Sequence, residues 1–241
     1  MRTAIVLSTL IALSATVQLP PNFQKCNRKQ PDFKECVFKA AQNAVPQLTR
    51  PYDDVNLPSL KPLHLTELTI GGNDGPVSLQ QKFKNCDLFG LDTMKLDSFE
   101  FDFEKKEMRL AGVIPEVRKL CQYEVKGQVL LLKVNGRGDS TIILKGLNVT
   151  DSLPFEYKKK KDKMYIHFTA SSVTLNPERV VYDFRNSDDK TLSDAINPVL
   201  NENWKDVFDD VKSDYEKLID KIILTVANNL FSKVSVEEAF D

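Results

Sequence analysis

The apolar residues of the C-terminal stretch recur at helical spacing. Between residues 202 and 234, the apolar positions from Trp204 through Ile222 to Val234, apart from Leu224, are separated by steps of one, three or four residues. This spacing places them along one face of an α-helix. At 1.5 Å per residue the helix would be roughly 45 Å long, well above the usual three turns. The pattern therefore predicts one long helix, with Asn203 as its N-cap, whose apolar face another element must cover.

Two shorter segments also have helical periodicity. Residues 31–48 place apolar side chains on one face, with Pro31 at the start and Pro46 where the helix ends or bends. Residues 191–200 predict a short helix, bent by Pro198, just before the long one.

The middle of the chain alternates with a period of two. Residues 98–104 alternate Phe99, Phe101 and Phe103 with acidic residues, which is typical of a strand with one solvated face. The run NGRGD at 135–139 is predicted to be a hairpin turn. Further strands are predicted at residues 107–114, 121–134, 140–149, 164–175 and 179–184.

This order of elements predicts the fold. About eight strands joined by short turns form an antiparallel sheet, and their position between helices gives an α+β fold. A sheet of this length coils, because the twist of its strands accumulates. The sequence therefore predicts a strongly curved antiparallel sheet wrapped around the long C-terminal helix.

Residues 1–17 are typical of a secretory signal peptide. Arg2 precedes an uncharged apolar run from Thr3 to Ala15, which is too short to span a bilayer. We therefore expect a secreted protein whose mature part, residues 18–241, is a single domain. Without the leader the chain has 32 basic and 34 acidic residues. It therefore has no excess of positive charge with which to bind the phosphates of a nucleic acid.

The cysteines indicate disulfides, because a secreted chain folds in an oxidising compartment. Cys26 and Cys36 bracket a short polar loop, which favours a local bond. Cys86 and Cys121 are then left to pair with each other or to remain buried thiols, and we favour the bond because leftover thiols are unusual in secreted proteins. Neither the cysteine spacing nor the two histidines indicates a metal site.

Several short motifs concern the surface. Asn148 begins the sequon NVT, which predicts N-glycosylation and an exposed position. The tripeptide RGD at 137–139 is interpreted as part of the hairpin turn rather than as an adhesion site. The lysines at 158–161 are interpreted as a solvated hairpin, with docking at an anionic membrane during ligand transfer as the alternative.

Several longer stretches together resemble the insect takeout and juvenile hormone-binding proteins. They are CNRKQPDFKECVFKA at 26–40, LPSLKPLHLTELTI at 57–70, YEVKGQVLLLKVNGRGDSTI at 123–142 and LSDAINPVLNENWKDVF at 192–208. They cover almost the whole mature chain in the order of that family. The chain departs from the family pattern at DFRNSDD (183–189) and at Pro198, and not all members have the second cysteine pair.

The resemblance implies a long helix rolled inside a curved antiparallel sheet around an apolar tunnel, as in tubular lipid-binding proteins. It also implies secretion into haemolymph or sensory fluid and carriage of juvenile hormone, a related terpenoid or a long-chain lipid. The candidate wall residues on the helix come from its apolar stripe: Val211, Tyr215, Leu218, Ile222 and Val226. Those on strands are chosen by parity: Phe101, Phe103, Leu130, Leu132, Ile166 and Phe168. Tyr215 would supply one orienting hydroxyl, while ordinary core packing is the alternative for each residue of the helical stripe.

We therefore expect a monomeric carrier, without enzymatic activity, metal or cofactor, that holds one elongated apolar molecule. The sequence has neither a Gly-x-Ser-x-Gly nucleophile elbow nor a His-Glu-x-x-His motif. No nucleic-acid partner is expected, and release of the ligand would involve transient contact with a membrane or receptor. The alternative hypothesis is an extracellular takeout-like signalling or chemosensory protein, related to circadian or feeding behaviour, that acts through a surface partner.

Overall fold

The computed structural model describes residues 17–71, 77–129, 132–187 and 190–241, so the predicted leader lies outside it apart from Val17. The helices are α1 (Phe33–Ala44), α2 (Lys190–Glu202), α3 (Trp204–Phe231) and α4 (Val236–Phe240), with 3-10 helices at Val45–Gln47, Asp53–Val55 and Leu91–Thr93. The strands are β1 (Leu63–Gly71), β2 (Val77–Phe89), β3 (Lys95–Asp102), β4 (Glu107–Val129), β5 (Leu132–Lys160), β6 (Lys163–Phe168), β7 (Thr174–Asn176) and β8 (Arg179–Asn186).

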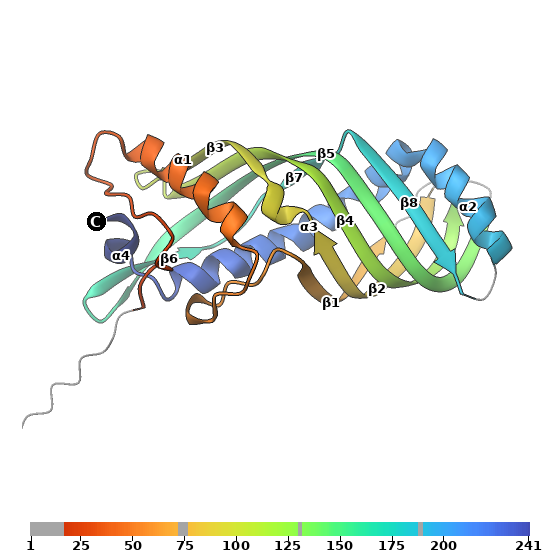
Figure 1. Ribbon diagram of the computed structural model, residues 1–241, viewed down its shortest axis with the longest axis horizontal. Coiled ribbons are helices and arrows are strands. Elements are labelled where there is room, and N and C mark those ends of the chain that lie inside the picture. The colour runs from red at the N-terminus through yellow and green to blue at the C-terminus, as the bar shows by residue number, and fades with distance from the viewer. Residues whose placement is uncertain (1–16, 72–76, 130–131, 188–189) are drawn as a thin grey trace, which may run out of the picture.

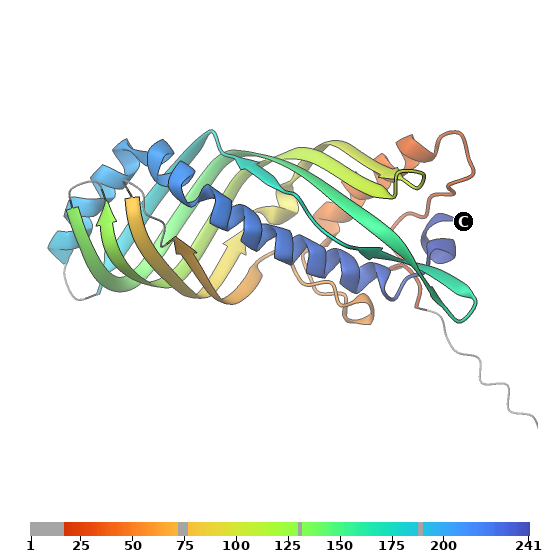
Figure 2. The same cartoon turned by 180° about the vertical axis from the view of Figure 1, so that it is seen from behind.

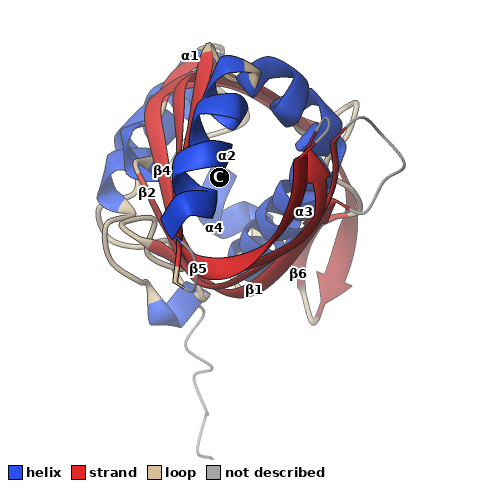
Figure 3. Ribbon diagram, turned by 90° about the vertical axis from the view of Figure 1, so that its right-hand side faces the viewer, coloured by secondary structure: helices blue, strands red, loops and turns tan. Residues whose placement is uncertain are grey.

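Two very long strands, β4 and β5, lie at the centre of one antiparallel sheet with the order β1-β2-β4-β5-β6. β3 also pairs with β4, and both β7 and β8 pair with β5 at different heights along it. The sheet curls around the long axis of the molecule, as the end-on view in Figure 3 shows. The predicted α+β architecture, with a strongly curved antiparallel sheet around a long C-terminal helix, is confirmed.

Helix α3 runs along the open side of this curl for most of the length of the molecule (Figures 1 and 2). It has 28 residues and begins directly after Asn203, as the sequence predicts. The Asn203 side chain does not cap it; the amide Nδ2 donates to the Val199 carbonyl at 2.9 Å instead. The reason is that α2 leads into α3 almost without a break, so Asn203 still belongs to the last turn of α2.

The strand prediction is wrong in one respect, because β4 and β5 are continuous where the sequence suggests several short strands. The run NGRGD is not a turn: Asn135 to Asp139 pair with Lys126 to Gln122 within the β4–β5 ladder. The RGD tripeptide therefore lies in a paired strand. The strands predicted at 98–104 and 107–114 pair as neighbours across a short turn, and the predicted hairpin around the lysines at 158–161 is confirmed.

The glycines of NGRGD serve a close approach between strands. A Cβ atom on Gly138 would lie 1.9 Å from the carbonyl oxygen of Arg185 in β8, and one on Gly136 would lie 2.1 Å from the Asn186 amide nitrogen. Any side chain at these positions would push β8 away from β5. A glycine-rich run is a turn marker in most sequences, and here close packing of the backbone accounts for it.

The free edge of β8 is bonded by side chains of α2. Asn201 accepts a hydrogen bond from the Tyr182 N–H at 2.9 Å and donates to the Tyr182 carbonyl at 2.8 Å. Asn197 makes the same pair of bonds with Phe184, at 2.9 and 3.0 Å. Four residues of helix rise about 6 Å and two residues of strand about 6.6 Å, so asparagines four apart match alternate strand residues.

Helix α3 bonds the same border further along, at β6 and just before β7, in the same way. The Asn228 side chain accepts from the Phe168 N–H at 2.9 Å and donates to the Phe168 carbonyl at 3.0 Å. Asp220 accepts from the Val173 N–H at 2.7 Å. Near the other border of the gap, Asp214 accepts from the Gly71 N–H of β1 at 3.0 Å. The helix thus joins both borders of the curl through polar side chains.

Two disulfides join further parts of the chain. Cys26 and Cys36 tie the N-terminal segment to α1, and Cys86 and Cys121 join β2 to β4. The second bond lies beside Asn85, where the register between β2 and β4 shifts. It therefore fixes the alignment of these strands next to a β-bulge.

We expect the asparagine bonds between α2 and β8 to contribute measurably to stability. Asn201→Ala leaves the Tyr182 N–H and carbonyl without these partners, which should lower the free energy of unfolding by about 2 kcal/mol. Chemical denaturation measures this change. Glu202→Ala, on the exposed side of the same helix, is the control and should change it by less than about 0.5 kcal/mol. Equal stability of both variants would contradict the role given to Asn201.

Candidate ligand cavity

The buried apolar residues form two clusters at opposite ends of the molecule. The α2-end cluster lies between α2, the first part of α3, β2, β8 and the adjoining parts of β4 and β5. The α4-end cluster lies between α1, α4, the last part of α3, β3 and β6. The apolar stripe of α3 contacts both clusters, and Ile223 packs against each of them.

The α4-end cluster is dominated by aromatic rings. Phe101 lies at its centre, with ring centroids 4.9 Å from Phe240, 5.1 Å from Phe103 and 5.8 Å from Phe231. Such rings pack at tilted and edge-on angles, which fills space efficiently. This end is therefore mainly packed core.

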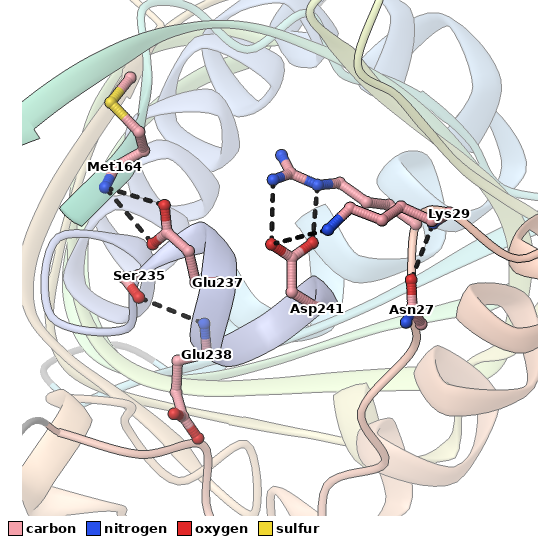
Figure 4. A network of polar contacts seen from close by, with 8 residues as sticks. Asn27, Lys29, Met164, Ser235, Glu237, Glu238 and Asp241 are labelled. Atoms are coloured by element: carbon pink, nitrogen blue, oxygen red, sulfur yellow. Dashed lines mark hydrogen bonds and ion pairs between the residues drawn. The ribbon is translucent and has the colours of Figure 1, made fainter.

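Helix α4 is fixed over this end by polar contacts, shown in Figure 4. Asp241 accepts two hydrogen bonds from the Arg28 guanidinium, at 2.8 and 3.1 Å. Glu237 accepts from the Met164 N–H of β6 at 3.3 Å. The C-terminus is thus joined both to the N-terminal segment and to the sheet.

The α2 end contains a narrow cavity of about 20 Å³. Most of its lining is apolar, and its polar side chains include Gln81, Tyr123 and Tyr182, all of them buried. The rest of the lining is Val125, Val134, Phe184, Asn186, Leu192, Ser193, Ile196, Leu200 and Val207. An apolar pocket with few polar groups is the usual form of a small-molecule site.

The two tyrosines of the cavity are well placed as neutral donors. Burial raises the pKa of both Tyr123 and Tyr182, so the hydroxyls stay protonated at neutral pH. Phe184 fixes their rings, at centroid distances of 4.9 Å from Tyr123 and 6.4 Å from Tyr182. Both residues line the cavity, so each protonated hydroxyl is a candidate donor to a polar group of a bound molecule.

The wall continues from the cavity along α3. Among the α3 residues, Val207, Phe208 and Val211 are buried, whereas Tyr215 and the apolar residues that follow are half-buried. Burial raises the pKa of Tyr215, yet this side chain keeps part of its surface uncovered.

Tyr215 is bonded to a lysine that the sequence analysis did not select. Lys119 of β4 is 4% exposed, and its Nζ lies 2.7 Å from the Tyr215 hydroxyl. It also lies 3.4 Å from the centroid of the Phe83 ring. Desolvation holds the pKa of Lys119 well below its usual range. Alternation counted from Val117 to Cys121 would have placed Lys119 on the inner face.

The predicted wall residues divide between the two ends. Those packed at the α2 end are Val211, Tyr215, Leu218 and Ile222. Those packed at the α4 end are Val226, Phe101, Phe103, Ile166 and Phe168. Leu130 lies outside the described residues, and Leu132 is the first residue of β5, with its side chain also outside the description. Their role as tunnel walls stays a prediction.

Ile222 and Val226 also line a second hollow. It is an open groove of about 480 Å³ between α3 and the loop from Pro51 to Pro58. The sequence analysis did not anticipate this groove, because nothing in the loop's composition shows which face of the helix it borders.

The described residues contain no group of three or more His, Cys, Asp or Glu side chains placed to hold a metal ion. Within the same residues, no helix is both long and apolar enough to cross a membrane. Asn148 lies exposed on β5, and its side-chain amide donates to the carbonyl of Asn176 at 3.4 Å.

Comparison with known proteins identifies relatives over nearly the full length. The circadian clock-controlled protein daywake of Drosophila melanogaster is 22% identical over 240 residues, which cover 95% of this chain and 91% of daywake. Daywake of Drosophila yakuba is 21% identical over 238 residues, with coverages of 95% and 90%.

Comparison with solved structures gives the same fold. The crystal structure of Takeout 1 from Epiphyas postvittana superposes with a TM-score of 0.79 at 23% identity, covering 90% of this chain and 99% of the other. The sequence model of the family described as haemolymph juvenile hormone binding protein (JHBP) matches residues 4–241. The chain therefore belongs to the haemolymph juvenile hormone binding protein family.

Proposed function

We propose that this protein is a secreted carrier of one elongated apolar molecule, held between α3 and the curled sheet. The observation that carries the proposal is the apolar cavity at the α2 end, which adjoins the half-buried stripe of α3. Juvenile hormone, a related terpenoid and a long-chain lipid all have the required shape. The family membership supports this class of ligand.

The energetics favour such a ligand. Apolar surface removed from water contributes about 25 cal/mol per Å², so burial of about 300 Å² contributes about 7.5 kcal/mol before the costs of association. Tyr123, Tyr182 and Gln81 add a few hydrogen-bonding groups that orient a polar end. The ligand's apolar body would thus supply most of the affinity, and its polar end would determine selectivity.

The carrier role involves no chemical step. The protein would bring the molecule into solution, shield it and release it at a membrane or receptor, and it would act as a monomer without cofactor. The two disulfides fit an extracellular site of action, in haemolymph or sensory fluid.

The second candidate function is an extracellular signalling or chemosensory protein that acts through a surface partner. The similarity to daywake, a protein described as circadian clock-controlled, is the observation that favours it. In that case a bound lipid would be incidental.

A cavity-blocking variant separates these functions. Leu192 lines the cavity, so Leu192→Trp should weaken uptake of an apolar fluorescent probe at least about tenfold, because the ring occupies the ligand's space. Ala195→Trp places the same ring on the exposed side of α2 and should leave uptake nearly unchanged. Titration of the mature protein with the probe measures both. Failure of the wild type to bind the probe would favour the second candidate.

Secretion and glycosylation can be tested in one expression experiment. Insect cells expressing the full chain should release a protein that begins near residue 18, and peptide-N-glycosidase should lower its apparent mass. Asn148→Gln removes the acceptor and should abolish that shift without changing secretion. Retention of the protein inside the cells, or a shift that persists in the variant, would contradict these expectations.

A further inference from the structure

The buried pair of Lys119 and Tyr215 indicates what the ligand's polar end is. We propose that these two side chains form an internal anchor for a carboxylate, so that the preferred ligand is an elongated apolar acid. This inference rests on the carrier function and adds the chemical class of the ligand's head group.

Lys119 has no ionic partner in the described part of the chain. It is the one basic residue there that is buried, and the pKa depression has burial as its only cause, with no contribution from a neighbouring carboxylate. Its polar contact is the Tyr215 hydroxyl, at 2.7 Å. The rings of Phe83 and Tyr215 surround the amine, with centroids at 3.4 and 5.0 Å.

Such an amine is unfavourable for stability alone. A buried charge without a partner destabilises a fold, and the uncharged form still leaves a strong polar group in apolar surroundings. A methionine would fill the same space without this cost. Asp151, the other deeply buried ionisable group of the interior, differs because it accepts hydrogen bonds from Ser171 and from the Ser172 N–H. Lys119 therefore lacks an anionic partner, and a bound ligand can supply one.

The position of the pair fits an anchor. Lys119 lies beside Ile142 of β5, which lies beside Tyr182 of β8, so the lysine is in the same row of the sheet as a residue that lines the cavity. Phe83, which contacts the amine, lies beside Tyr123, another cavity residue. Lys119 thus lies two strands from Tyr182 on the face of the sheet that also carries the cavity lining.

The chemistry matches a carboxylate better than a hydroxyl or an ester. A carboxylate accepts from the Lys119 ammonium and from the Tyr215 hydroxyl at once, and both bonds are charge-assisted. An alcohol or ester head can accept these bonds but cannot neutralise the ammonium. The titratable side chain in direct contact with Lys119 is Tyr215 on α3, and Tyr182 on β8 is the next one across the sheet. Neither carries a charge that would repel an acid.

The test compares head groups on one hydrocarbon chain. Delipidated mature protein is titrated with palmitate, 1-hexadecanol and methyl palmitate in competition with an apolar fluorescent probe. The wild type should bind palmitate at least about tenfold more tightly than hexadecanol, as expected for a charge-assisted pair. Lys119→Met should lose at least about tenfold in palmitate affinity and leave hexadecanol affinity within about threefold. Tyr215→Phe should weaken palmitate binding by a smaller factor.

Lys126→Met is the matched control, because it removes one lysine from the exposed face of the same strand. It should bind all three compounds as the wild type does. Equal affinity of the wild type and Lys119→Met for palmitate, with hexadecanol still bound, would overturn the anchor and leave the carrier function intact. Failure of the wild type to bind any of the three compounds would instead overturn the carrier function.

Discussion

The unpaired edges of a curled, open sheet are the constraint on which this structure depends. A sheet that closes into a barrel pairs its last strand with its first, but this one leaves backbone N–H and carbonyl groups free on both borders. The structure satisfies them with helical side chains spaced to match the strands. Asn197 and Asn201 of α2 and Asp220 and Asn228 of α3 bond the border formed by β6, β7 and β8. Asp214 of α3 bonds the other border, at Gly71 of β1.

This attachment has a consequence for the interior. Because α2 and α3 are held at the sheet's borders by polar bonds, their apolar faces do not have to approach the concave face closely. At the α4 end the Phe101 group of rings fills the remaining volume. At the α2 end smaller side chains and two tyrosines leave a narrow cavity of about 20 Å³. The same architecture thus provides packed core at one end and space at the other.

The sequence predicts those features that depend on simple periodicity. The spacing from Trp204 to Phe231 defines α3, and alternation around Phe101 identifies β3 and its buried face. Local alternation cannot reveal that β4 continues through Pro115, because Arg118 and Lys119 obscure the pattern between two apolar runs. Gly138 misleads for a related reason: Arg185 of β8, whose backbone requires it, is 47 residues away in sequence (185 − 138).

The candidate site is harder to predict because it depends on pairing across the sheet. Helical spacing places Tyr215 on the apolar face of α3, but its partner Lys119 is 96 positions away in sequence. A lysine is ordinarily expected on the solvent-exposed surface. The division of the predicted wall residues between two ends likewise depends on where α3 crosses each strand. Periodicity along one segment contains no information about that crossing.

The edge bonds also bear on how such a chain can diverge. They require a few polar side chains at four-residue intervals on α2 and α3, whereas the interior requires only apolar volume of suitable shape. Mutations in the cavity lining therefore alter which molecule fits while leaving the framework intact. This separation of framework from lining explains how the fold persists at 23% identity to Takeout 1, and it leaves ligand preference free to evolve within one architecture.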